Sequence, residues 1–92
     1  MTAIDVDCVR TLTGWTCSVR LGLPDSSPSR HEVTVSRADL ERLARGASDP
    51  TDLVRRSFEF LLRREPPRSI LPAFDLPAIA RYFPEYESTI RG

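Results

Sequence analysis

The sequence lacks several residue types on which enzyme and metal sites depend. Its 92 residues include no lysine, asparagine or glutamine, only one histidine, two cysteines and four glycines. It contains no glycine-rich phosphate loop, no G-x-S-x-G nucleophile motif and no paired metal-ligand spacing. Two cysteines and one histidine make at most an incomplete metal site. We therefore predict no catalytic residues, no cofactor and no metal, and expect that the protein is not an enzyme.

Charge and hydropathy exclude further classes. The 13 cationic residues, all arginine, balance 13 acidic ones, so no overall field attracts nucleic acid or an anionic membrane. The use of arginine alone is typical of a genome rich in G and C. No apolar run approaches the roughly 20 residues of a membrane span, and the start MTAIDVDCVR lacks the features of a signal peptide. We predict a cytoplasmic protein with a single domain at residues 1–92.

The first 35 residues alternate apolar and polar side chains with the period of two that is typical of strands. Pairing the first two runs so that residue numbers sum to 25 brings every apolar residue opposite another, and a slip of one residue would spoil all the pairs. The pairs are Ile4 with Leu21, Val6 with Val19, and Cys8 with Cys17. A third run follows the link GLPDSSPSR, which reads as a flexible hairpin tip. Residues 1–35 are thus predicted to form a three-stranded antiparallel meander with one apolar face.

The cysteines and the histidine allow alternative interpretations. Cys8 opposite Cys17 lies close enough to form a disulfide, whereas a reducing cytoplasm favours two thiols that pack as small hydrophobic side chains. A redox or metal role is the third interpretation, and we expect the two buried, reduced thiols. His31 stands at the exposed end of a predicted strand, so we expect a surface or half-buried side chain. A general base would need a neighbouring nucleophile, and none is indicated.

Residues 36–92 are predicted to cover the sheet with two to three helices. Ser36 and Asp39 form a capping box for a helix over 37–45 that stops at Gly46. A longer helix begins after Asp49 and ends at the proline pair 66–67. Its apolar residues span roughly 200° of the circumference, which indicates contacts on two sides.

The stretch FDLPAIARYFPEY is predicted to supply the second contact. Asp75 reads as the N-cap of a two-turn helix that Pro84 ends, and Phe74, Ile79 and Phe83 pack on the long helix as a lid. The fold class is therefore α+β, in the order β-β-β-α-α-α with the helices on one face. The expected core includes these six residues: Trp15, Val19, Val33, Leu40, Phe58 and Leu61.

Two surfaces are candidates for binding. The segment FDLPAIARYFPEY is expected to be mainly a structural lid. Aromatic residues beside an arginine are typical of protein interfaces, so the alternative is that Arg81, Tyr82 and Tyr86 rim a protein-binding or self-association patch. A local surplus of cations on the long helix is expected to form a solvated face with ion pairs, and the alternative is a face that contacts nucleic acid. Its residues are Arg55, Arg56, Arg63, Arg64 and Arg68.

A resemblance adds to this interpretation. The run LVRRSFEFLLRREPPRSIL, followed by FDLPAIARYFPEY, resembles the shared C-terminal portion of a family of small uncharacterised bacterial proteins of actinobacterial type. The resemblance implies a bacterial, cytoplasmic protein and carries over no catalytic residues. The order of strands and helices is also similar to that of HicB-like antitoxins, in topology only. We expect a non-enzymatic interaction or regulatory protein that binds another protein or itself. The alternative is an antitoxin-like regulator that binds nucleic acid through the arginine face.

Overall fold

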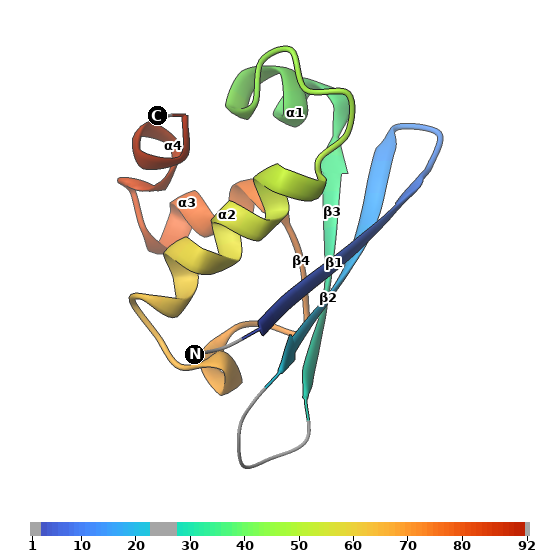
Figure 1. Ribbon diagram of the computed structural model, residues 1–92. Helices are drawn as coiled ribbons and strands as arrows, with labels where there is room; N and C mark the ends of the chain where they lie inside the picture. Colours follow the sequence, from blue (N-terminus) through green and yellow to red (C-terminus); the bar gives the residue numbers. More distant parts are fainter. Residues whose placement is uncertain (1–2, 23–27, 92) are drawn as a thin grey trace.

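The computed structural model describes residues 3–22 and 28–91 and contains one four-stranded sheet with helices on one of its faces (Figure 1). The tip of the predicted hairpin link, residues 23–27, lies outside the described residues. The strands are β1 (Ala3–Arg10), β2 (Gly14–Gly22), β3 (Ser29–Ser36) and β4 (Ala73–Asp75). The helices are α1 (Arg37–Leu43), α2 (Thr51–Leu62), α3 (Ile79–Tyr82) and α4 (Tyr86–Ile90), with short 3-10 turns η1 (Pro67–Ser69) and η2 (Leu76–Ala78).

The register of the first two strands is as predicted. Cys8 lies opposite Cys17, and Val6 lies opposite Val19. At the turn between the strands, Gly14 lies so close to the Val35 carbonyl and the Ser36 backbone that a Cβ at this position would clash with β3. The α+β class is confirmed, and the antiparallel meander β1-β2-β3 is present.

A fourth strand makes the sheet mixed, which differs from the predicted three-stranded meander. β4 pairs in parallel with β3, placing Phe74 beside Val33, and Glu32 N–H donates to the Pro72 carbonyl at 2.8 Å. The predicted N-cap at Asp75 is confirmed in position only, because its side chain makes no capping bond. Asp75 stands at the start of η2, and its carboxylate accepts a hydrogen bond from the Thr34 hydroxyl.

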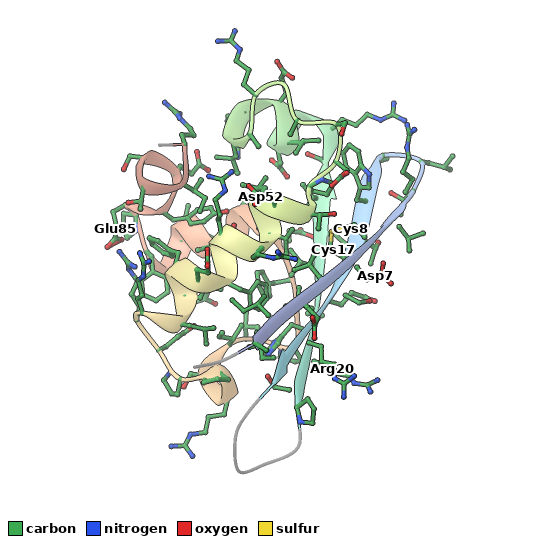
Figure 2. The ribbon with its side chains drawn as sticks, in the orientation of Figure 1. Asp7, Cys8, Cys17, Arg20, Asp52 and Glu85 are labelled. Carbon is green, nitrogen blue, oxygen red and sulfur yellow. A yellow bond between two sulfur atoms is a disulfide. The ribbon has the colours of Figure 1, made fainter. Side chains whose placement is uncertain are left out.

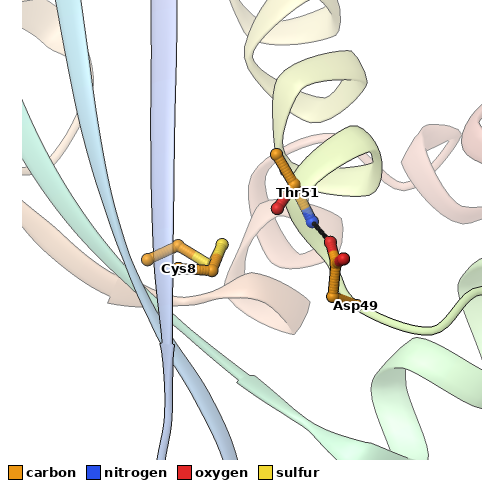
Figure 3. Close-up of a disulfide and its surroundings, with 4 residues drawn as sticks. Cys8, Asp49 and Thr51 are labelled. Carbon is orange, nitrogen blue, oxygen red and sulfur yellow. Dashed lines mark hydrogen bonds between the residues drawn. A yellow bond between two sulfur atoms is a disulfide. The ribbon is translucent and has the colours of Figure 1, made fainter.

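The predicted helix ends are largely confirmed. Ser36 Oγ accepts from Asp39 N–H at 3.0 Å while Asp39 accepts from Ser36 N–H, which completes the capping box of α1. Gly46, with φ of +85°, then turns the chain where other residues would be strained. At the start of α2, Asp49 Oδ1 accepts from Thr51 N–H at 2.9 Å, and this bond lowers the pKa of the carboxyl (Figure 3).

The core lies between the sheet and α2, with α3 and α4 on the other side of α2 (Figure 1). All six residues named for the core are buried, and Phe58 is fully inaccessible. The prediction of a lid is confirmed for two of its three residues: Ile79 is buried, and the Phe83 ring lies 5.9 Å from that of Phe60 on α2. It is wrong for Phe74, which lies in the sheet on β4 beside Val33, with its ring 6.1 Å from that of Phe58. The predicted two-turn helix is in fact η2 followed by α3, and α4 resumes after Pro84.

Two expectations about individual side chains are wrong. Cys8 and Cys17 form a disulfide instead of two thiols, with their Cα atoms 4.0 Å apart, and it projects toward the start of α2 (Figure 3). Their opposition on paired strands is compatible with a disulfide and with two thiols. The thiols were predicted because the cytoplasm is reducing. His31 belongs to the core: it is 5% exposed, lies 5.5 Å from the Phe58 ring, and its Nδ1 lies 2.8 Å from the Leu71 carbonyl oxygen.

Candidate partner-binding groove

An apolar groove of about 330 Å³ lies between the end of α2, the segment that follows η1, and α3. The chain forms it because Pro66 and Pro67 end α2 and turn the backbone toward β4, after which η2 and α3 run back along α2. We call this feature the groove. Its lining consists of Leu61, Glu65, Ser69, Ile70, Leu71, Phe74, Ala78, Ile79, Tyr82 and Phe83.

The floor and the rim of the groove differ in exposure. Leu61, Ile70 and Ile79 are buried and make the floor. At the rim, Leu71 is 46% exposed and Tyr82 is 67% exposed. Large apolar side chains that stay in solvent beside an apolar depression are typical of a binding surface.

The three residues predicted to rim a binding patch do not lie together in the structure. Arg81 and Tyr82 are exposed on α3, and Tyr82 lines the groove. The prediction that Tyr86 joins this rim is wrong, because Tyr86 is fully buried at the start of α4. The turn at Pro84 redirects the chain so that α4 packs its first residue against α2. Its ring meets the edge of Phe60 with the ring centroids 5.3 Å apart.

Tyr86 is instead part of a buried hydrogen-bonded pair. Its hydroxyl lies 2.6 Å from Ser57 Oγ, and Ser57 donates to the Leu53 carbonyl at 2.7 Å. Ser57 has a single hydroxyl proton, so Tyr86 is the donor between the two. Burial raises the pKa of Tyr86 to about 12, although the hydrogen bond between Tyr86 and Ser57 opposes the shift. The sequence did not indicate this pair.

The five arginines of the second candidate surface do not present one common face. Arg56 donates to Asp52 at 3.0 Å and to the Ile90 carbonyl at 2.8 Å, which ties α2 to α4. The guanidinium of Arg64 stacks 3.5 Å from the centre of the Phe60 ring and donates to the Phe60 carbonyl. These two side chains therefore make contacts within the fold.

The other members of this set lie elsewhere on the surface. Arg55 and Arg63 are exposed on and just after α2, and Arg68 is exposed on η1. Arg64 also lies 3.9 Å from Glu85, a carboxylate at the margin of the helical layer (Figure 2). The arrangement gives the nucleic-acid interpretation no specific support.

Residues 3–22 and 28–91 contain neither a metal-binding cluster nor a membrane-spanning helix. In these residues no group of three or more histidine, cysteine, aspartate or glutamate side chains is placed to hold a metal ion. Within the same ranges, no helix has both the length and the apolar character needed to cross a membrane.

Sequence reasoning found Tyr82 but missed the other groove residues. Glu65 follows α2, and Leu71 lies between η1 and the unpredicted strand β4, so neither residue belongs to an element with a periodic pattern. The sole local signal was the apolar pair Ile70-Leu71 between two prolines. Comparisons with protein-family models, with curated proteins and with solved structures find no match to this chain, so its resemblance to a bacterial family stays a prediction.

Proposed function

We propose that this protein is a small, non-enzymatic interaction module that binds a segment of another protein in the groove. The observation that supports this most directly is the pair of exposed apolar residues, Leu71 and Tyr82, that stand over a buried apolar floor. A volume of about 330 Å³ is at the small end of ligand pockets, which suits one or two bulky side chains of a partner.

The carboxylate of Glu65 indicates which charge the partner segment carries beside the groove. Glu65 is half-buried in the lining and does not take part in the ion pairs found among the described residues. A cation placed beside Glu65 in a complex would be partly shielded from water. This shielding would strengthen a charge-assisted hydrogen bond between the two. The favoured partner segment therefore carries an aromatic or large aliphatic side chain next to an arginine or lysine.

The cytoplasmic location belongs to the same proposal. Thiols are kept reduced in the cytoplasm, whereas disulfides persist in oxidising compartments. For protein taken directly from its cells, the proposed cytoplasmic location therefore predicts two free thiols, whereas the Cys8–Cys17 disulfide predicts none. The arginine-face alternative is less favoured, because Arg56 and Arg64 are engaged within the fold.

Two groove variants with a matched control test the proposal. Tagged wild-type protein, Leu71→Ser, Tyr82→Ser and Leu12→Ser are used to capture partners from cells of the source organism. Leu12 is 96% exposed in the β1–β2 turn, outside the groove, so it controls for the loss of any exposed apolar side chain. We expect a partner that binds the wild type and the control but is reduced at least tenfold with either groove variant.

The stability of each variant is measured alongside, and exposed substitutions should change it by no more than about 0.5 kcal/mol. Partner capture that is unchanged in both groove variants would contradict the proposal. A partner that is lost equally with the Leu12 control would do so as well.

A further inference from the structure

β1 lies at the edge of the sheet and leaves one row of backbone groups open. At its end, Thr11 N–H donates to the Gly14 carbonyl at 2.8 Å, which makes this a hydrogen-bonded pair of the antiparallel ladder. Such pairs alternate along a strand, so the odd-numbered residues of β1 bond to β2. The N–H and C=O groups of Ile4, Val6 and Cys8 therefore point away from β2. Among the described residues no strand pairs with this edge.

The position of the disulfide supports this assignment independently. In an antiparallel pair the Cα atoms are closer at the non-hydrogen-bonded positions, at about 4.5 Å, than at the bonded ones, at about 5.5 Å. The Cα atoms of Cys8 and Cys17 are 4.0 Å apart. The backbone groups of Cys8 thus face the open edge.

The apolar face of the sheet extends to this edge without being fully covered. On β2, Val19 and Leu21 are at most 1% exposed. Their partners on β1, Val6 and Ile4, are only half-buried. The cover that the helices provide therefore ends along β1, and apolar side chains of an added strand would continue the same layer.

The opposite face of β1 is acidic. Asp5 and Asp7 are exposed and alternate with the β1 residues that pack against the core, so they face away from the helices. Asp7 lies on the same side of the sheet as Arg20 (Figure 2). Asp5 has Arg20 as its neighbour on β2, but the neighbour of Asp7 is Ser18, so the charge of Asp7 is not balanced within the ladder. Residues of an added strand opposite Asp5 and Asp7 would occupy non-hydrogen-bonded positions, where side chains are closest.

The charges of Asp5 and Asp7 determine which kind of strand can pair with the open edge of β1. Two copies of β1 paired antiparallel through their open groups would set Asp5 against Asp7, or Asp7 against Asp7, in the longest registers. Like charges directly opposite each other are destabilising, so a second copy of this chain is disfavoured. Cationic side chains at the same positions would be attracted.

We propose that β1 accepts an extended segment of another protein in which cationic residues alternate with apolar ones. Its backbone completes the ladder, its cations face Asp5 and Asp7, and its apolar side chains pack beside Ile4 and Val6. This mode of recognition takes affinity from main-chain hydrogen bonds and specificity from alternate side chains. The surface is separate from the groove, and either proposal stands if the other fails.

The probe is the acetylated, amidated peptide GKVKVKVG, in which lysine and valine alternate. It is titrated into ¹⁵N-labelled full-length protein. We expect amide shifts concentrated at Ile4, Val6 and Cys8 and increased protection of these amides from hydrogen exchange. Asp7→Arg should weaken binding by on the order of tenfold, because attraction becomes repulsion at one cross-strand position.

Glu32→Arg is the matched control. Glu32 lies on the same exposed face, two strands from the edge, and the substitution makes the same change in net charge. It should change the affinity by less than about twofold if the contact is local. The peptide with N-methyl groups on its valines is a second control, because it keeps the charge but loses backbone donors.

The outcomes separate the alternatives. Edge shifts, with loss of binding in Asp7→Arg and in the N-methylated peptide, support the proposal. Equal loss in Glu32→Arg, or unchanged binding of the N-methylated peptide, would mean general charge attraction and overturn it. Absence of binding would mean that the acids serve only to prevent edge-to-edge association. A stable dimer paired through β1 would also overturn it.

Discussion

The buried hydroxyl pair of Tyr86 and Ser57 should respond very differently when one member is removed than when both are. Tyr86 O–H donates to Ser57 Oγ, and Ser57 in turn donates to the Leu53 carbonyl. Both side chains are fully buried, so water cannot replace a lost partner. The two substitutions Ser57→Ala and Tyr86→Phe, alone and together, form a double-mutant cycle across α2 and α4.

The costs follow from which group is left without a partner. Ser57→Ala leaves the Tyr86 hydroxyl buried and unbonded, which costs about 1–3 kcal/mol; the better helix propensity of alanine offsets a few tenths of this. Tyr86→Phe leaves Ser57 its bond to Leu53 and costs about 0.5–1.5 kcal/mol. The double variant leaves no unsatisfied hydroxyl, and its cost should resemble that of Tyr86→Phe alone. The coupling energy therefore equals the net cost of Ser57→Ala, about 1–3 kcal/mol.

Urea unfolding followed by the fluorescence of Trp15 measures the four free energies, provided that the m-values agree. Ser88→Ala is the control, because Ser88 is an exposed serine whose hydroxyl donates to the Glu85 carbonyl at 3.0 Å, and its loss should cost less than about 0.5 kcal/mol. Additive costs in the cycle, or a neutral Ser57→Ala, would refute the assignment of this bond.

Three further predictions concern the core, the disulfide and pH. Phe58→Ala should destabilise the fold by about 3–5 kcal/mol in urea unfolding, since the ring is fully buried, and a loss below about 1 kcal/mol would contradict its placement. Reducing the Cys8–Cys17 disulfide, whose partners are 9 residues apart, should lower the free energy of unfolding by about 2.5 kcal/mol; thiol titration of denatured, unreduced protein should find none, and two thiols would disprove the bond. The pKa of Tyr86 is raised from 10.0 to about 12, so the unfolded chain loses this proton first as pH rises. Stability should fall by about 2 kcal/mol between pH 10 and 12, and a decrease of the same size in Tyr86→Phe would show that another group is responsible.

The elements that the sequence predicted well are those whose signals are local and repeated. The pairing of β1 with β2 rests on several apolar pairs that a slip would break, and the structure has this register. The start of α1 depends on the two side chains Ser36 and Asp39, three residues apart, and both capping bonds are present. In these cases neighbouring residues determine the geometry, so tertiary contacts have little to override.

The features that were missed depend on contacts between distant segments. β4 has only three residues, too few to show a period, and it joins Phe74 to Val33 without any hairpin turn. Pro84 ends one helix, as predicted, and Tyr86 begins the next one two residues later. That helix, α4, has five residues, which are too few to show a periodic pattern. The groove depends on both elements. Only its exposed tyrosine, Tyr82, could be chosen from composition.

Both proposed binding surfaces lie where the helical cover ends. α2 has 12 residues and is about 18 Å long, whereas the nine residues of β2 extend about 30 Å. One helix of this length cannot cover the apolar face of four strands, and α1, α3 and α4 are shorter still. The central strands are buried first, which leaves the inner side of β1 half-covered and the groove open beyond the end of α2. Partners that cover these two places would complete the core, and this is the physical reason to look for function there.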